Sequence, residues 1–188
     1  MRQKEAVAAG DKWKIADANE FPGSPFQRIG SDWMLVTAGD LKDDKGNWNT
    51  MTASWGGLGI LWTKKVAFVF VRHSRHTFQF VNDSPILTLS FFDDDHRNAL
   101  KLCGEKSGRD IDKATASGLT PIFFTEGPSN GAVAFNEAKD ILVCKKLYSQ
   151  NIESSCFIEK DIIKKVYSDN DFHRMYVAEV VGYYRSLA

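Results

Sequence analysis

Hydrophobic residues along the chain gather in short runs that are separated by charged, glycine or proline positions. Most of these runs are rich in valine, isoleucine and phenylalanine, which are the residues that strands favour. We therefore expect strands over residues 32–38, 50–55, 66–71, 86–92, 122–124, 133–135, 140–152 and 175–184.

Helices are expected to be few and short. Ser74 suits the start of a helix over about residues 75–82, because its hydroxyl can accept from the free amides of a first turn. Further helices are expected over about residues 96–104 and in the segment that ends at Ser117. Many strands with few short helices are typical of an antiparallel barrel.

The connections suggest a single domain. Residues 43–47 are predicted to form the polar turn of a hairpin, and the glycine-rich stretch 56–65 to form a loop around a rim. The breaker at residues 22–25 separates an N-terminal arm, residues 1–30, from the domain, residues 31–188.

Composition narrows the class of protein. Lysine plus arginine equal aspartate plus glutamate at 24 each, so no basic field favours nucleic acid. The longest apolar run, residues 66–71, is far shorter than the roughly 18 residues of a membrane span. The N-terminus lacks the apolar core of a signal peptide. The chain has three cysteines, Cys103, Cys144 and Cys156, and they lack metal-ligand spacing. This pattern fits reduced thiols, so we expect a cytoplasmic location.

Two stretches carry the candidate binding chemistry. The first is the small-residue segment, which reads Thr50, Met51, Thr52, Ala53, Ser54 and Trp55. Small residues let backbone amides approach a flat ligand closely. The second is the arginine cluster after the strand at 66–71, in which we single out Arg72, Ser74, Arg75 and Thr77. Guanidinium forks and hydroxyls match the oxygens of a phosphate, so the two stretches together suggest a phosphorylated planar cofactor.

Each stretch also has a purely structural interpretation. The arginine cluster could be a solvated turn beside a capped helix, and the small-residue segment could make room for a neighbouring strand. Trp55 fits either the core or the wall of a ring site. The histidines lack ligand spacing, so no metal site is expected. No Gly-x-Gly-x-x-Gly motif follows a strand, so we expect no Rossmann domain.

The order of these motifs resembles the flavin reductase-like family over roughly residues 25–185. The resemblance rests on the run Asn49–Gly56, the strand that ends in Arg72–Thr77, and the segments Phe91–Phe92, Ser107–Lys113, Val143–Lys145 and His173–Val180. It implies a mainly β, FMN-binding split β-barrel of antiparallel, Greek-key type, with a few short helices. It also implies a homodimer with FMN near the subunit boundary.

The family pattern assigns the small-residue segment to the edge of the flavin ring and its ribityl chain. It places Ser107–Lys113 near the cofactor or substrate opening, where Lys113 would add positive charge. Ala114 replaces the aromatic residue that the family usually has there. His173 matches a family position, although it also fits a simple turn residue.

The resemblance implies an oxidoreductase that uses NADH or NADPH as a transient co-substrate and passes a hydride through FMN to a flavin or another small acceptor. The alternative is a flavoredoxin-like FMN electron carrier that a redox protein partner reduces. A relative of the pyridoxamine-phosphate oxidases and a barrel used only for binding are the third and fourth interpretations. The sequence offers no convincing catalytic constellation, so no catalytic acid or base is predicted; this fits a hydride transfer, which needs little acid–base chemistry from the protein.

Overall fold

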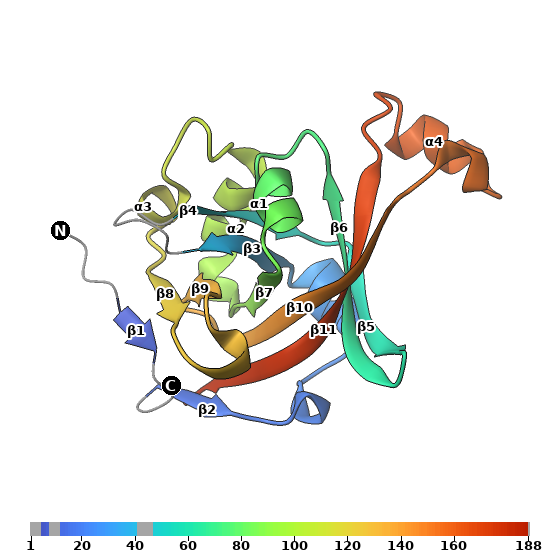
Figure 1. Ribbon diagram of the computed structural model, residues 1–188. Coiled ribbons are helices and arrows are strands. Elements are labelled where there is room, and N and C mark those ends of the chain that lie inside the picture. Colours follow the sequence, from blue (N-terminus) through green and yellow to red (C-terminus); the bar gives the residue numbers. More distant parts are fainter. Residues whose placement is uncertain (1–4, 8–11, 41–46, 188) are drawn as a thin grey trace.

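The computed structural model describes residues 5–7, 12–40 and 47–187. Most of the predicted turn at residues 43–47 lies outside these ranges. Among the described residues the body is an open, mainly antiparallel sheet in the order β4-β3-β7-β10-β11-β6-β5, with β2 paired to β11 (Figure 1). Its strands are β2 (Trp13–Ile15), β3 (Met34–Asp40), β4 (Asn47–Ala53), β5 (Gly56–Leu61), β6 (Lys64–Arg72), β7 (Ile86–Phe91), β10 (Asp140–Asn151) and β11 (His173–Ser186).

A smaller sheet and short helices complete the fold. The small sheet joins β1 (Glu5–Val7), β8 (Pro121–Phe124) and β9 (Val133–Phe135). The α-helices are α1 (Thr77–Asp83), α2 (Arg97–Glu105), α3 (Lys113–Ser117) and α4 (Asp161–Val166). The single-turn and irregular helices are η1 (Ala18–Glu20), η2 (Phe26–Ser31), η3 (Asp94–His96), η4 (Gly127–Ser129) and η5 (Ser154–Cys156).

Hydrophobic residues cover both faces of the large sheet. Successive residues of a strand point to opposite faces, and both Leu35 and Val36 of β3 are fully buried. They belong to two different hydrophobic clusters, one packed with Tyr176 and the other with Ile141. Strands covered on both faces read as continuous apolar runs, which explains why the sequence pattern locates β3, β7 and β10 well.

The stretch at residues 56–65 is a strand hairpin, so the predicted rim loop was wrong. β5 pairs antiparallel with β6, and the connecting residues Trp62 and Thr63 both have positive φ angles, of 51° and 57°. Such a two-residue turn matches the right-handed twist of the strands that it joins. A Cβ atom on Gly56 would lie 2.8 Å from the carbonyl oxygen of Phe68, so glycine allows the close approach of β5 to β6 here.

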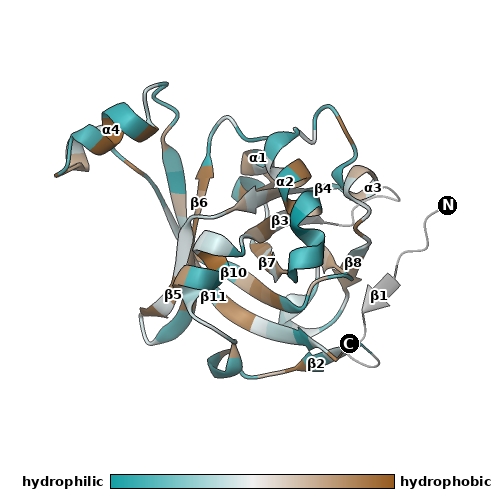
Figure 2. Ribbon diagram, turned by 180° about the vertical axis from the view of Figure 1, so that it is seen from behind, coloured by the Kyte–Doolittle hydropathy of each residue, from teal (hydrophilic) through white to brown (hydrophobic). Residues whose placement is uncertain are grey.

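A long excursion separates β10 from β11. The arm, defined here as residues 152–172, contains η5 and α4 and stands away from the sheet (Figure 1). The sequence pattern did not predict α4. Figure 2 shows that α4 carries hydrophobic as well as polar colour, and Ile158 in the arm is 95% exposed. The arm therefore presents apolar surface outside the core.

Candidate functional site

A hollow of about 250 Å³ lies at the ends of β4 and β6 and at the start of β11. It is lined by Met51, Thr52, Ala53, Ser54, Trp55, Phe70, Arg72, Arg75 and His173. The pairing of His173 with Arg72 in adjacent strands brings the start of β11 beside the end of β6. Residues from both stretches predicted from sequence, the small-residue segment and the arginine cluster, thus meet in one place.

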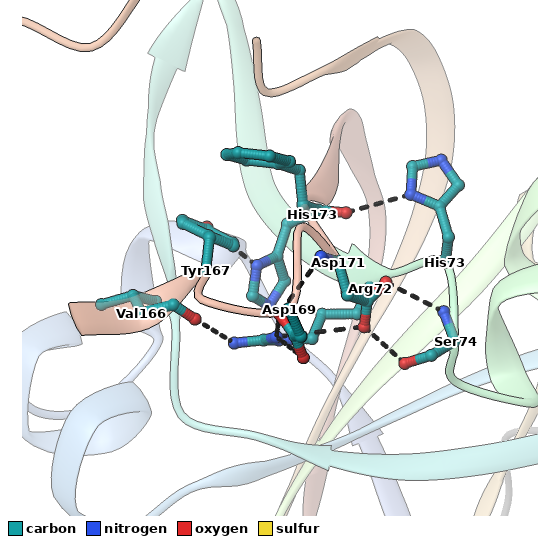
Figure 3. A network of polar contacts seen from close by, with 9 residues as sticks. Arg72, His73, Ser74, Val166, Tyr167, Asp169, Asp171 and His173 are labelled. Atoms are coloured by element: carbon teal, nitrogen blue, oxygen red, sulfur yellow. Dashed lines mark hydrogen bonds and ion pairs between the residues drawn. The ribbon is translucent and has the colours of Figure 1, made fainter. Parts of the chain in front are cut away.

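Arg72 points toward the arm as well as lining the hollow. Its Nη2 donates to the carbonyl of Val166 at 2.9 Å, and Nη1 lies 3.4 Å from both carboxylate oxygens of Asp169 (Figure 3). Its guanidinium carbon lies 5.3 Å from the centre of the Tyr167 ring, and Nη1 is 3.9 Å from Asp171. Part of the charge that we expected to hold a phosphate is therefore compensated by the arm.

Ser74 also binds the arm, so its predicted role as a helix cap was wrong. Its backbone N–H and its hydroxyl donate to the two carboxylate oxygens of Asp171, at 3.2 and 2.5 Å. Helix α1 begins only at Thr77, after a turn, and the residue before it, His76, makes no capping side-chain hydrogen bond. Ser74 therefore lies outside the first turn of α1, and its hydroxyl donates to Asp171 rather than accepting from the free backbone amides of that turn.

Arg75 is the arginine of the cluster that the structure leaves most open to solvent. It lines the hollow, and its Nη1 donates to the carbonyl of Gly104 at the end of α2, at 2.7 Å. A carbonyl carries no net charge, so this contact orients the guanidinium without neutralising it. Arg75 is therefore the better placed of the two arginines to attract an anion.

Three of the predicted site residues are buried beside the hollow without lining it. Thr50 Oγ1 lies 2.8 Å from Thr37 Oγ1, and Thr77 Oγ1 accepts from Asn49 Nδ2 at 2.9 Å. The ammonium of Lys113 donates to the carbonyls of Thr50 and Cys103, both at 2.8 Å.

Burial lowers the pKa of Lys113 to about 8. In this structure Lys113 therefore joins α3 to β4 and α2. The hydroxyl of Thr50 links β4 to β3, and the hydroxyl of Thr77 links α1 to β4.

His173 joins the hollow to the arm. Its Nδ1 lies 2.9 Å from the hydroxyl oxygen of Tyr167, and its ring centre lies 5.0 Å from that of Trp55. Burial, followed by the positive charge of Arg72, lowers the pKa of His173 to about 4, so the imidazole is neutral at neutral pH. Burial raises the pKa of the Tyr167 hydroxyl, which therefore keeps its proton.

Phe70 was not among the residues predicted from the sequence, and the role of His173 was left open. Phe70 precedes Arg72 by two positions on β6, and side chains two apart share a face of a strand. Period-two alternation back from Arg72 was therefore a usable signal for Phe70. The lining role of His173 depends on the pairing of β11 with β6, which sequence spacing alone does not reveal.

The donor set of the hollow fits a phosphorylated planar ligand. Ala53 and Ser54 are small, Trp55 is 48% exposed and offers a flat ring, and no acidic side chain in the described part of the chain pairs with the guanidinium of Arg75. Within the described ranges no group of three or more His, Cys, Asp or Glu side chains is placed to hold a metal ion. No helix in the described part of the chain has the length and apolarity needed to cross a membrane.

Comparison with known proteins identifies the family of this chain. The family profile described as "Flavin reductase like domain" matches residues 26–186, so the chain belongs to the flavin reductase-like family. A search of curated proteins finds no match.

Solved structures share the fold at low sequence identity. An FMN-binding domain of a flavin reductases-like enzyme from Shewanella baltica is 13% identical, with a TM-score of 0.62 over 92% of this chain and 76% of that chain. Flavoredoxin of Desulfovibrio vulgaris is 19% identical, with a TM-score of 0.58 over 80% of this chain and 67% of that chain. An NADH:FAD oxidoreductase from Streptomyces globisporus is 14% identical, with a TM-score of 0.59 over 85% of this chain and 80% of that chain. The fold is the split barrel of this family, although the large sheet of this chain is not closed.

Proposed function

We propose that this protein is an NAD(P)H-dependent flavin or acceptor oxidoreductase that uses FMN in the hollow. The observation that carries the proposal is the meeting of the small-residue segment, Trp55 and Arg75 around one cavity. Bound FMN would supply two-electron chemistry, accepting a hydride from NADH or NADPH and passing electrons to a flavin or another small acceptor. The match to the family supports the proposal.

The side chains around the hollow would bind and orient the cofactor. Residues 51–54 would line the edge of the ring, and Trp55 would offer it an aromatic face. Arg75 would hold the phosphate, with Arg72 contributing less because Asp169 and Asp171 already compensate its charge. Neutral His173 would offer a hydrogen bond without adding charge to the ring site.

A homodimer is the second part of the proposal. The hollow of about 250 Å³ is smaller than most ligand sites, which run from about 300 Å³ upward, so one chain encloses a flavin only in part. Beside it, an apolar groove of about 650 Å³ runs along the arm, and Trp55 lines both cavities. A second copy seated on the arm would cover this groove and complete the wall of the flavin site.

One observation favours a second candidate function, a flavoredoxin-like electron carrier. Trp55 is 48% exposed at the border between the hollow and the groove, so a protein docked on the arm would reach the edge of the flavin site. In that case a protein partner, rather than NADH or NADPH, would reduce the cofactor.

Anaerobic addition of NADH and of NADPH to the FMN-loaded protein separates the two candidates. Bleaching of the flavin absorption band by either nucleotide, at a rate that depends on its concentration, is the result we expect for the oxidoreductase. A flavin that stays oxidised with both nucleotides, and that a redox protein reduces, would identify the carrier. Trp55→Leu is a useful companion variant, because it should change the rate while Trp62→Leu, at an exposed turn outside the hollow, should not.

A further inference from the structure

We propose that Tyr167 is a positioning residue that fixes His173 in the tautomer with its proton on Nε2, so that His173 presents an N–H donor to the hollow. The acceptor would be a carbonyl oxygen of a planar heterocycle held against Trp55. The identity of that heterocycle as a flavin or a nicotinamide rests on the proposed function, whereas the tautomer does not.

The contacts around Tyr167 hold its ring in one place. Tyr167 directly follows α4 and is only 5% exposed. Its ring stacks on Phe172 with centres 4.7 Å apart and planes at 20°, and the Arg72 guanidinium lies over it. Arg72, at the end of β6, also donates to the backbone carbonyl of the neighbouring Val166 (Figure 3). Arg72 therefore holds both the ring of Tyr167 and the backbone before it against β6.

The direction of the hydrogen bond follows from the chemistry of the two groups. Both side chains are buried, His173 at 8% exposure, which disfavours ionised forms of either. A phenol is a good donor, and the unprotonated nitrogen of a neutral imidazole is a good acceptor. The Tyr167 hydroxyl therefore donates to Nδ1 of His173 across 2.9 Å, and the ring proton remains on Nε2.

The free nitrogen is available to a ligand. Nε2 of His173 has no hydrogen-bond partner among the residues that the structure describes, and His173 lines the hollow beside Trp55. The charged and titratable groups around the imidazole are Arg72 and Arg75 from the β6 side, His73 in the same turn, and Asp171 and Tyr167 from the arm. A donor aimed into the hollow would select ligands that carry a carbonyl oxygen there.

Nitrogen-detected NMR of the full chain labelled with nitrogen-15 tests the tautomer without any cofactor. The His173 signals are assigned by their loss in His173→Asn. We expect the wild type at neutral pH to show a protonated Nε2 and an unprotonated Nδ1, and Tyr167→Phe to show a mixture of tautomers. A proton on Nδ1 in the wild type, or an unchanged tautomer in Tyr167→Phe, would overturn the proposal. If Tyr167→Phe does not fold, the wild-type spectrum alone decides.

A matched control isolates the effect of the hydroxyl. Tyr176→Phe also removes a buried tyrosine hydroxyl from this region, but that hydroxyl has no hydrogen-bond partner in the described structure. It should leave the His173 tautomer unchanged.

Ligand measurements then identify the heterocycle. Loss of one neutral hydrogen bond predicts about two- to tenfold weaker binding in Tyr167→Phe, while Tyr176→Phe stays at the wild-type value. Weaker FMN binding would identify the flavin carbonyl, and an unchanged FMN affinity with a raised KM for the nicotinamide would identify the nicotinamide. An unchanged affinity for both would contradict the donor role. A wild type that binds no FMN would contradict the proposed function instead, and the NMR result would still decide the tautomer.

Discussion

Arg75 and Gly104 are joined by a hydrogen bond of 2.7 Å from the guanidinium Nη1 to the carbonyl oxygen. The bond brings the turn after β6 onto the end of α2. Gly104 also packs against Thr52, because a Cβ atom there would lie 3.3 Å from the Thr52 Cβ. Helix α2 therefore holds both predicted stretches, through Thr52 and Arg75, at the border of the hollow.

Arg75→Ala should weaken FMN binding by about 1.5–3 kcal/mol, the usual contribution of a hydrogen bond to a charged group. Riboflavin lacks the phosphate, so its affinity should stay the same in this variant. Isothermal titration with both ligands measures the difference.

Arg174→Ala is the matched control for Arg75→Ala. Arg174 follows His173 on β11 but contacts Ser149 and Asn82 rather than the hollow, so its loss should leave FMN affinity unchanged. An equal loss of riboflavin and FMN affinity in Arg75→Ala would place the phosphate elsewhere.

The structure also predicts which ion pair matters for stability. Arg28 in η2 donates to Asp140 at 2.8 Å, and the hydroxyl of Tyr183 donates to the other carboxylate oxygen of Asp140 at 2.5 Å. Asp140→Asn removes the nearer of two carboxylates that pair with the largely buried Arg28, because Asp32 lies 3.7 Å away. Breaking a buried pair in this way typically costs about 3–5 kcal/mol, and the remaining partner Asp32 places the expected loss at the lower end. Urea unfolding should show this loss.

The matched control is Asp161→Asn, which removes the exposed pair of Asp161 with Lys164. Exposed pairs contribute about 0–1 kcal/mol, so this variant should unfold near the wild-type midpoint. Similar midpoints for the two variants would show that Arg28 and Asp140 are not coupled.

His173 predicts an acid-labile contribution to stability. Its pKa falls from an ordinary 6.5 to about 4 in the folded chain, so the unfolded chain takes up the proton first as the pH falls. The contribution of His173 to the free energy of unfolding is therefore fully present above pH 6.5 and is lost as the pH falls from 6.5 to about 4. At about 1.4 kcal/mol per pKa unit, the loss is on the order of 3 kcal/mol.

Urea unfolding of His173→Gln across the same pH range checks this contribution. The variant should lose less stability on acidification than the wild type. His73→Gln, at an exposed position in the neighbouring turn, serves as the control. Identical pH profiles for wild type and His173→Gln would contradict the buried, neutral imidazole.

The arm predicts a change in oligomeric state. Ile158 is 95% exposed and lines the apolar groove, so Ile158→Glu should convert a dimer into monomers by placing a charge at the interface. Light scattering coupled to gel filtration measures the mass. Ile15→Glu changes another exposed isoleucine, on β2 outside the groove, and should leave the dimer intact. A dimer that persists in Ile158→Glu would exclude the groove as the interface.

Sequence patterns located the strands of the body because the sheet is buried on both faces. Leu35, Val36, Val69 and Val71 are fully buried, and their short apolar runs rich in β-branched residues favour buried strands. The same patterns did not predict β5, because Gly56, Gly57 and Gly59 interrupt the apolar pattern of this edge strand, which pairs with β6.

The sequence proposed that the small-residue segment and the arginine cluster act together, and the structure places Arg75 and residues 51–55 around one hollow. Sequence spacing could not show how they meet, because β4 and β6 lie near opposite ends of the sheet order, nor could it show where the arm returns to the sheet. Asp171 contacts Ser74 from 97 residues away, and no local signal marks this pairing. For the same reason, the sequence could not show that Arg72 binds the arm or that Lys113 is buried under β4.

Titration of the purified protein with FMN, followed by the change in flavin fluorescence, tests the central claim most directly. We predict saturable binding of one FMN per chain, and its loss in Ser54→Trp, which fills the hollow while leaving the circular dichroism spectrum and the thermal unfolding midpoint close to those of the wild type. Absence of FMN binding by the wild type, or binding by a folded Ser54→Trp with undiminished affinity, would contradict the assignment of the hollow as the flavin site.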